Sequence, residues 1–369
     1  MAKHSYLIED PAVLQSFLND NIWKKRYYSD FMPLKYTPTI NYRYKIAEKG
    51  AQVAAEIVSF GSKAPRKFRE TGDVKYGQLP PIRVKRLMDE DDLLEYDTAM
   101  RQPQTPSREI MDWIFGDVGF VYDAIEAERD YLALQVLCNF TLDLTTTTNP
   151  NAPTQTQFTF GLPAAQKICV KSSATTRKWG TGTDTQIQPI TDFYDVQDTI
   201  MDAGKEPAKY VLMNTTQWRQ FIKADEVVDF GGPNVFNQPP RALGPAVNAA
   251  LSAAGLPQVV VVNTRIRREI NDGSTLIRTT TNPWTDNYCT FAPSLQMGNM
   301  LYTDPPAKGR ETDTTVQSYR NGILVSKWYE KDPITEYTKG ESVCFPIIPN
   351  IYNLWRFRTS QAQSDGLDN

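Results

Sequence analysis

Histidine is almost absent from this chain: His4 is the only one among 369 residues. A Ser-His-Asp triad would have to recruit His4, because that triad needs an imidazole as its base. A histidine-rich metal centre and a di-iron bundle built on Glu-x-x-His are excluded outright. The scarcity of histidine argues against an enzyme, although enzymes without histidine exist.

Cysteine is also scarce, and it is dispersed. The four cysteines are Cys138, Cys169, Cys289 and Cys344, and none lies in a C-x-x-C pair. Zinc ligands normally come as close pairs, so a zinc site is not expected. We expect free thiols rather than disulfides, and we expect no metal or other cofactor.

Long apolar runs and a dominant charge are missing as well. No apolar stretch approaches the roughly 18 residues that a membrane span needs. The net charge is -3, from 40 basic and 43 acidic residues, so no overall basic field draws the chain to nucleic acid. The glycine-rich stretches 180–184 and 230–234 match no phosphate-binding motif. The N-terminus lacks a secretory apolar region, so we expect synthesis in a cytoplasm.

The first 45 residues have the composition of an arm. Val13, Leu14, Phe17 and Leu18 predict a short amphipathic helix after Asp10-Pro11. A dense run of aromatic residues follows and needs a surface to pack against. That surface is either the chain's own domain or a neighbouring subunit.

Residues 46–87 predict a long two-stranded excursion. The stretches 55–61 and 81–87 alternate like strands, and a polar segment rich in proline and glycine separates them. A two-stranded hairpin is marginally stable by itself, so we expect it to lean on another element.

The clearest helix covers residues 105–140. Thr105 is placed to cap it and Pro106 suits its first position. Apolar residues recur at spacings of three, four and seven. Gly116 and Gly119 weaken its middle and indicate a bend or a close crossing.

The rest of the chain alternates helices with buried strands and then becomes rich in strands, which predicts an α+β fold. Helices are expected at 193–203, at 215–224 with Thr215 as cap, and at 240–255. Strands are expected at 208–214, 257–263, 274–281, 294–302 and within 315–359.

The acidic run Asp89, Glu90, Asp91 and Asp92 has three interpretations. It can be a solvated turn, a contact with a basic segment of a neighbouring chain, or a metal or catalytic site. Consecutive residues cannot all face one point on a regular element, and the spacing is not that of a calcium-binding loop. The first two interpretations are therefore preferred.

Charges elsewhere suit contacts between chains. A basic cluster lies on the predicted excursion and is complementary in sign to the acidic run, and a second lies at 265–268. Glu126 and Arg129 lie on a charged flank of the long helix, which is either solvated or faces a partner. The candidate intersubunit contact residues are Lys63, Arg66, Lys67, Arg69, Lys75, Arg83, Lys85, Arg86, Asp89, Glu90, Asp91, Asp92, Glu126 and Arg129.

Four stretches, in this order, resemble one family. They are "IRVKRLMDEDDLL", "REIMDWIFGDVGFVYDAIEAERDYLALQVL", "KYVLMNTTQWRQFIK" and "SKWYEKDPITEYTKGESVCFPIIPN". They are similar to the loop-exit strand, the spine helix, the axial-domain strand and helix, and the closing segment of tailed-bacteriophage major capsid proteins. These have the Hong Kong 97 type fold, and the closest resemblance is to the lambda-type major capsid protein E family.

The resemblance implies an N-terminal arm (1–45), an extended loop (46–87), a peripheral domain (88–184 and 302–369) with the spine helix, and an axial domain (185–301). It implies a structural subunit, not an enzyme, that forms hexamers and pentamers of an icosahedral capsid around double-stranded DNA. The implied partners are further copies, a separate scaffolding protein, a portal protein, a possible decoration protein, and DNA contacted non-specifically, but no membrane. Assembly would take place in the cytoplasm of the bacterial host.

Two other functions stay open at this point. One is the shell of an encapsulin-like bacterial compartment, which would use the same fold around an enzyme cargo. The other, more remote, is a hydrolase that depends on Asp and Glu residues.

Overall fold

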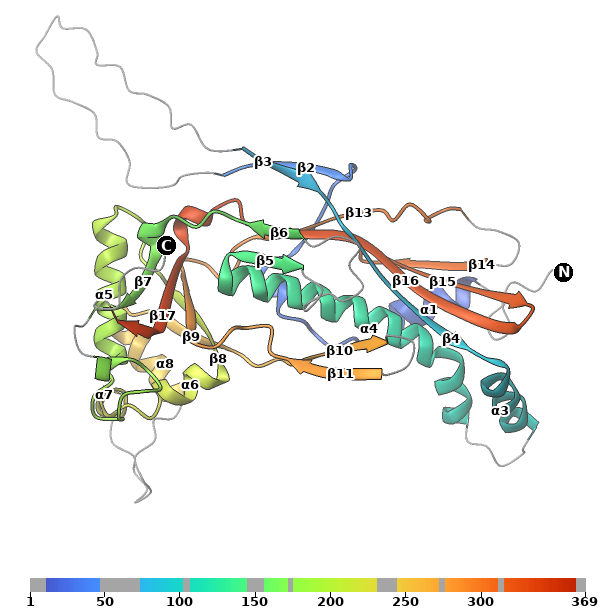
Figure 1. Ribbon diagram of the computed structural model, residues 1–369, viewed down its shortest axis with the longest axis horizontal. Coiled ribbons are helices and arrows are strands. Elements are labelled where there is room, and N and C mark those ends of the chain that lie inside the picture. The colour runs from blue at the N-terminus through green and yellow to red at the C-terminus, as the bar shows by residue number, and fades with distance from the viewer. Residues whose placement is uncertain are drawn as a thin grey trace, which may run out of the picture. The chain divides into compact units, whose positions relative to one another are not determined.

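The computed structural model describes residues 11–46, 74–101, 107–144, 156–171, 175–230, 244–271, 276–310 and 315–362 (Figure 1). The chain divides into two compact units. Unit 1 comprises Met1–Arg43, Tyr76–Ala133 and Asn299–Ile347, and unit 2 comprises Tyr44–Lys75, Leu134–Gly298 and Ile348–Asn369. Helix α4 (Ser107–Asn139) begins in unit 1 and ends in unit 2.

Unit 1 contains a six-stranded sheet in the order β1-β13-β16-β15-β14, with β4 paired to β16. Its strands are β1 (Leu34–Tyr36), β4 (Pro81–Met88), β13 (Asn299–Thr303), β14 (Thr315–Arg320), β15 (Ile323–Lys331) and β16 (Ile334–Ile347). Asn321 and Gly322 both have positive φ between β14 and β15, as a two-residue hairpin turn requires.

Helices α1 (Pro11–Asp20) and α4 cover one face of this sheet. Because strand side chains alternate between faces, Ile82 and Val84 of β4 point to the same core as Val121 and Ile125 of α4. The approach is close at Gly340 of β16, where an added Cβ would lie 2.8 Å from Ile125 Cδ1. We call this side of the sheet the inner face and the opposite side the outer face.

Unit 2 contains a five-stranded sheet in the order β7-β17-β12-β8-β9. Its strands are β7 (Lys167–Val170), β8 (Tyr210–Asn214), β9 (Gln258–Val262), β12 (Tyr288–Ala292) and β17 (Trp355–Ala362), and its helices are α5 (Pro189–Asp202), α6 (Thr215–Phe221), α7 (Asp225–Phe230) and α8 (Gly244–Ala253). Its core is strongly aromatic, with Phe193 packed between Phe221 and Phe291.

The remaining described elements are short. Three are two-stranded sheets, formed by β2 (Asn41–Lys45) with β3 (Val74–Gln78), β5 (Thr141–Leu144) with β6 (Thr156–Thr159), and β10 (Ile266–Asn271) with β11 (Leu276–Thr281). Two are small helices, α2 (Tyr28–Phe31) and α3 (Glu90–Arg101). Single 3-10 turns lie at Ala164–Gln166, Thr175–Arg177 and Ile351–Asn353.

Most predicted elements are present, including α1, the long helix and the late strands. The predicted cap of that helix, Thr105-Pro106, lies outside the described residues, as does the expected strand 55–61. Neither Gly116 nor Gly119 marks a close crossing, because nothing lies within 4 Å of where a Cβ would be.

The strand at 81–87 is present and leans on another element, as expected, because it pairs with β16. Two local expectations are corrected. Helix α6 is capped by Asn214, whose side chain accepts from the Gln217 amide at 2.9 Å, and not by Thr215. The acidic run opens a helix, α3, where a turn was expected.

The two units also set borders that differ from the predicted domains. Residues 134–184 and 348–362, expected in a peripheral domain, belong to unit 2. The five-stranded sheet explains this, because β17 pairs with β12 and β7 pairs with β17 at the edge. The names peripheral and axial remain predictions.

Candidate subunit-contact site

The acidic run is the start of helix α3. The Asp92 amide donates to Asp89 Oδ1 at 3.1 Å, and the Asp89 amide lies 3.4 Å from Asp92 Oδ2. This reciprocal arrangement caps the helix, and the acids sit where the helix dipole favours negative charge. Glu90 additionally accepts from the Ile334 amide at 3.3 Å. Asp89 and Asp92 therefore have a local structural role, while Asp91 is exposed.

The basic residues of β4 are distributed over both faces of the sheet. On the outer face, Arg83 Nη2 lies 2.8 Å from Glu341 Oε1, opposite it on β16. Burial raises the pKa of Glu341, but hydrogen bonds from Lys339 and Arg83 outweigh it, so the pKa lies below its usual value. Lys85 Nζ lies 4.3 Å from the centre of the Tyr337 ring, as in a cation–π contact.

Arg86 belongs to the inner face. Its guanidinium lies 3.1 Å from Asp117 Oδ1 on α4 and 4.8 Å from the centre of the Phe120 ring. Burial raises the pKa of Asp117 despite this partner. Arg86 is thus engaged within the chain.

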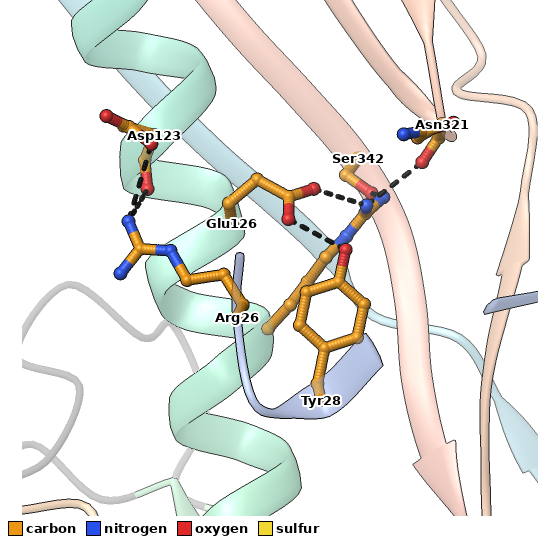
Figure 2. A network of polar contacts seen from close by, with 7 residues as sticks. Arg26, Tyr28, Asp123, Glu126, Asn321 and Ser342 are labelled. Atoms are coloured by element: carbon orange, nitrogen blue, oxygen red, sulfur yellow. Dashed lines mark hydrogen bonds and ion pairs between the residues drawn. The ribbon is translucent and has the colours of Figure 1, made fainter. Parts of the chain in front are cut away.

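Glu126 and Arg129 form the centre of a buried polar network (Figure 2). Arg129 is 0% exposed and donates to Glu126 Oε1 at 3.0 Å. Its other contacts are the Asn321 carbonyl at 2.9 Å and Ser342 Oγ at 2.8 Å. The two residues were expected on a helix flank that is either solvated or faces a partner; within this chain both are buried instead.

The N-terminal segment completes this network. Tyr28 Oη donates to Glu126 Oε2 at 2.7 Å, and the Tyr28 amide donates to Asp130 Oδ1 at 2.9 Å. Burial raises the pKa of the Tyr28 hydroxyl, which keeps it a proton donor. Gln15 of α1 accepts from Ser318 Oγ at 2.6 Å on β14. The described part of the arm therefore packs on its own unit.

The other predicted contact residues divide into two groups. Lys75 lies half-buried on β3. The basic cluster of Lys63, Arg66, Lys67 and Arg69 lies outside the described residues. The second basic cluster lies on the β10–β11 ribbon, where Arg278 Nε binds Glu269 Oε1 at 2.9 Å.

Sequence reasoning missed the arm's contribution to the network. Tyr28 stands in an aromatic run that indicated packing, but no local pattern pairs it with Glu126. Among the described residues, no group of three or more His, Cys, Asp or Glu side chains is placed to hold a metal ion. None of the described helices has the length and apolarity needed to cross a bilayer.

Several solved structures that the chain resembles come from phages or prophages. The chain resembles a protein assigned as a prophage capsid protein from E. coli CFT073, with a TM-score of 0.58, 14% identity, and 95% of this chain and 98% of that chain covered. It resembles a phage-related protein from Bordetella bronchiseptica RB50, with a TM-score of 0.56, 10% identity, and 98% and 99% covered. A chain of the mature capsid of bacteriophage PhiM1 matches with a TM-score of 0.50, 9% identity, and 92% and 88% covered.

These likenesses confirm the predicted α+β fold of the Hong Kong 97 type. A sequence comparison with curated proteins finds no match. The model of one family, described as phage major capsid protein E, matches residues 37–358. The chain therefore belongs to the phage major capsid protein E family and is a structural subunit of a tailed-phage capsid shell.

Proposed function

We propose that copies of this chain assemble as hexamers and pentamers into a closed icosahedral capsid around a double-stranded DNA genome. The family match over residues 37–358 carries this proposal. It is supported by a surface with charges of both signs and by the placement of β4 and α3, which present charged side chains outside the core.

The role of the chain in this proposal is structural, and it performs no catalysis. Asp89 and Asp92 cap helix α3, and Glu126 and Arg129 bond to each other inside the unit, so these two pairs have structural roles. Contacts with DNA would be weak and non-specific, because the net charge of -3 provides no overall attraction to phosphate.

The proposed partners are a separate scaffolding protein, a portal protein and a decoration protein, and the shell would assemble in the bacterial cytoplasm. The basic cluster at 63–69 is proposed to contact a neighbouring copy. Single exposed ion pairs contribute only about 0–1 kcal/mol, but a closed shell repeats each of them in every subunit.

The test is to express the chain alone and together with the scaffolding gene beside it, and to image both by negative-stain electron microscopy. Closed shells, capsomers or tubes are expected. A variant with Lys63, Arg66, Lys67 and Arg69 changed to Ala should assemble less while its melting temperature stays unchanged. A monomer under both conditions would contradict the proposal.

A further inference from the structure

Unit 1 exposes an apolar and basic patch on the outer face of its sheet. Leu87 of β4 lies opposite Tyr337 of β16, and the Tyr337 ring stacks on Trp328 of β15 with centroids 5.3 Å apart. Lys85 lies over the Tyr337 ring. Leu87 is 49% exposed. We call Lys85, Leu87, Trp328 and Tyr337 the outer patch.

The outer patch is positively charged on the side of Arg83, Lys85 and Lys339, while Glu330 lies exposed at its other end. Arg83 and Lys339 both bind the carboxylate of Glu341, which is only 2% exposed. Two cations share this one anion, and Lys85 adds a third positive charge beside them. A ligand for the patch should therefore combine an apolar side chain with negative charge.

Helix α3 presents that combination on its solvent side. Asp91, Leu94, Glu95 and Thr98 are all exposed, and their spacing of three, four and seven places them on one side of the helix. Leu94 is 63% exposed. Neither Asp91 nor Glu95 has an ion-pair partner within the part of the chain that the structure describes.

Within one copy the two surfaces do not cover each other. Leu93 anchors the buried side of α3, whereas Leu94 on its other side is 63% exposed. Leu87 of the outer patch is 49% exposed in the same chain. Each surface is therefore free to contact another molecule.

We propose that the solvent side of α3 in one copy docks on the outer patch of a second copy. The two surfaces stay exposed within one chain, and their charges and leucines are complementary. Because the two surfaces differ, the contact is heterologous, and repetition with a closing rotation produces a ring. This inference rests on the proposed shell and adds to it a named pair of contact surfaces.

Thiol linking tests the contact directly. The variant Leu87→Cys with Leu94→Cys is assembled into particles and treated with a short bismaleimide linker. The four native cysteines are all buried, so the background should be low. A ladder of dimers, trimers and higher multiples in a denaturing gel is expected. Each single variant, Leu87→Cys or Leu94→Cys, is the control and should give no ladder.

Several results would overturn the proposed docking. One is that the double variant forms particles but gives no cross-linked ladder. A dimer from Leu94→Cys alone would show α3 against α3 instead, and linkage of Leu87→Cys to a different virion protein would show another occupant. If the unmodified chain forms no particles, the proposed shell fails and the docking fails with it.

Charge reversal gives an independent check. Lys85→Glu and Glu95→Lys should each lower the yield of particles several-fold, and the combined variant should recover most of it. Circular dichroism of the dissociated chains shows whether each variant is folded. A combined variant that assembles as poorly as the single variants, with all three folded, would refute the pairing.

Discussion

The hydroxyl of Tyr28 provides the sharpest test of how the arm is held. Tyr28→Phe removes one oxygen and keeps the ring, which is only 4% exposed. Glu126 Oε2 then loses the donor at 2.7 Å while Glu126 itself stays 8% exposed. Hydrogen bonds to charged groups contribute about 1.5–3 kcal/mol, so we expect unit 1 to lose stability of that order.

Urea unfolding followed by circular dichroism measures the change, with tryptophan fluorescence as a second probe. The Trp23 ring lies tilted against Tyr122 with centroids 4.2 Å apart, so its share of the emission changes when the arm is released. The matched control is Tyr194→Phe, the same chemical change at a side chain that is 45% exposed on α5. If Tyr28→Phe shifts the unfolding midpoint no more than Tyr194→Phe, the network does not hold the arm.

The remaining predictions concern pH and packing. Burial raises the pKa of Asp192 to about 7, even though Trp179 Nε1 and Arg177 Nη2 donate hydrogen bonds to its carboxylate. The pKa in the unfolded chain is about 3.9, so between these two values the native state binds a proton that the unfolded state has lost. The free energy of unfolding should therefore fall as the pH rises from about 4 through 7. The melting temperature of Asp192→Asn should vary less over pH 5–8 than that of the unmodified chain, and equal slopes would contradict the assignment. Gly340→Ala places a Cβ 2.8 Å from Ile125 Cδ1 and 3.1 Å from the Val121 carbonyl, so denaturant unfolding should show a loss of about 1–3 kcal/mol. In Gly119→Ala the added methyl group has open space on a helix, so this variant should be more stable than the unmodified chain by up to ~1 kcal/mol. If Gly119→Ala were less stable than Gly340→Ala, the packing of α4 on β16 would be refuted.

The sequence predicted those helices and strands in which the spacing of apolar residues alone shows which side chains are buried. The apolar spacing of α4 and the alternation in β4, β15 and β16 are visible without partners. Helix α3 was missed because four acids suggest a turn, although Asp89 and Asp92 stand at the spacing of a reciprocal cap.

Pairings between distant segments could not be predicted in this way. Glu126 and Arg129 are three residues apart on a helix, a spacing that an exposed ion pair would also have. Their burial depends on contacts from distant segments, namely those of Tyr28, Asn321 and Ser342. Likewise, nothing in the sequence around Arg83 indicates that Glu341 lies across from it. The burial of a charge depends on which remote segment covers it.

The assembly of one sheet from early and late segments has a consequence for synthesis. Strand β4 ends at Met88, but its partner residues on β16 begin at Glu336. A ribosome adding about 5–20 residues per second exposes β4 for roughly tens of seconds before that partner exists. In the proposed docking, the nascent subunit has no finished outer patch to offer a neighbour, so polymerisation would wait for nearly complete chains. Arg83, Lys85 and Arg86 repel a second β4 during this interval, and like charges on an exposed strand are a known protection against premature pairing.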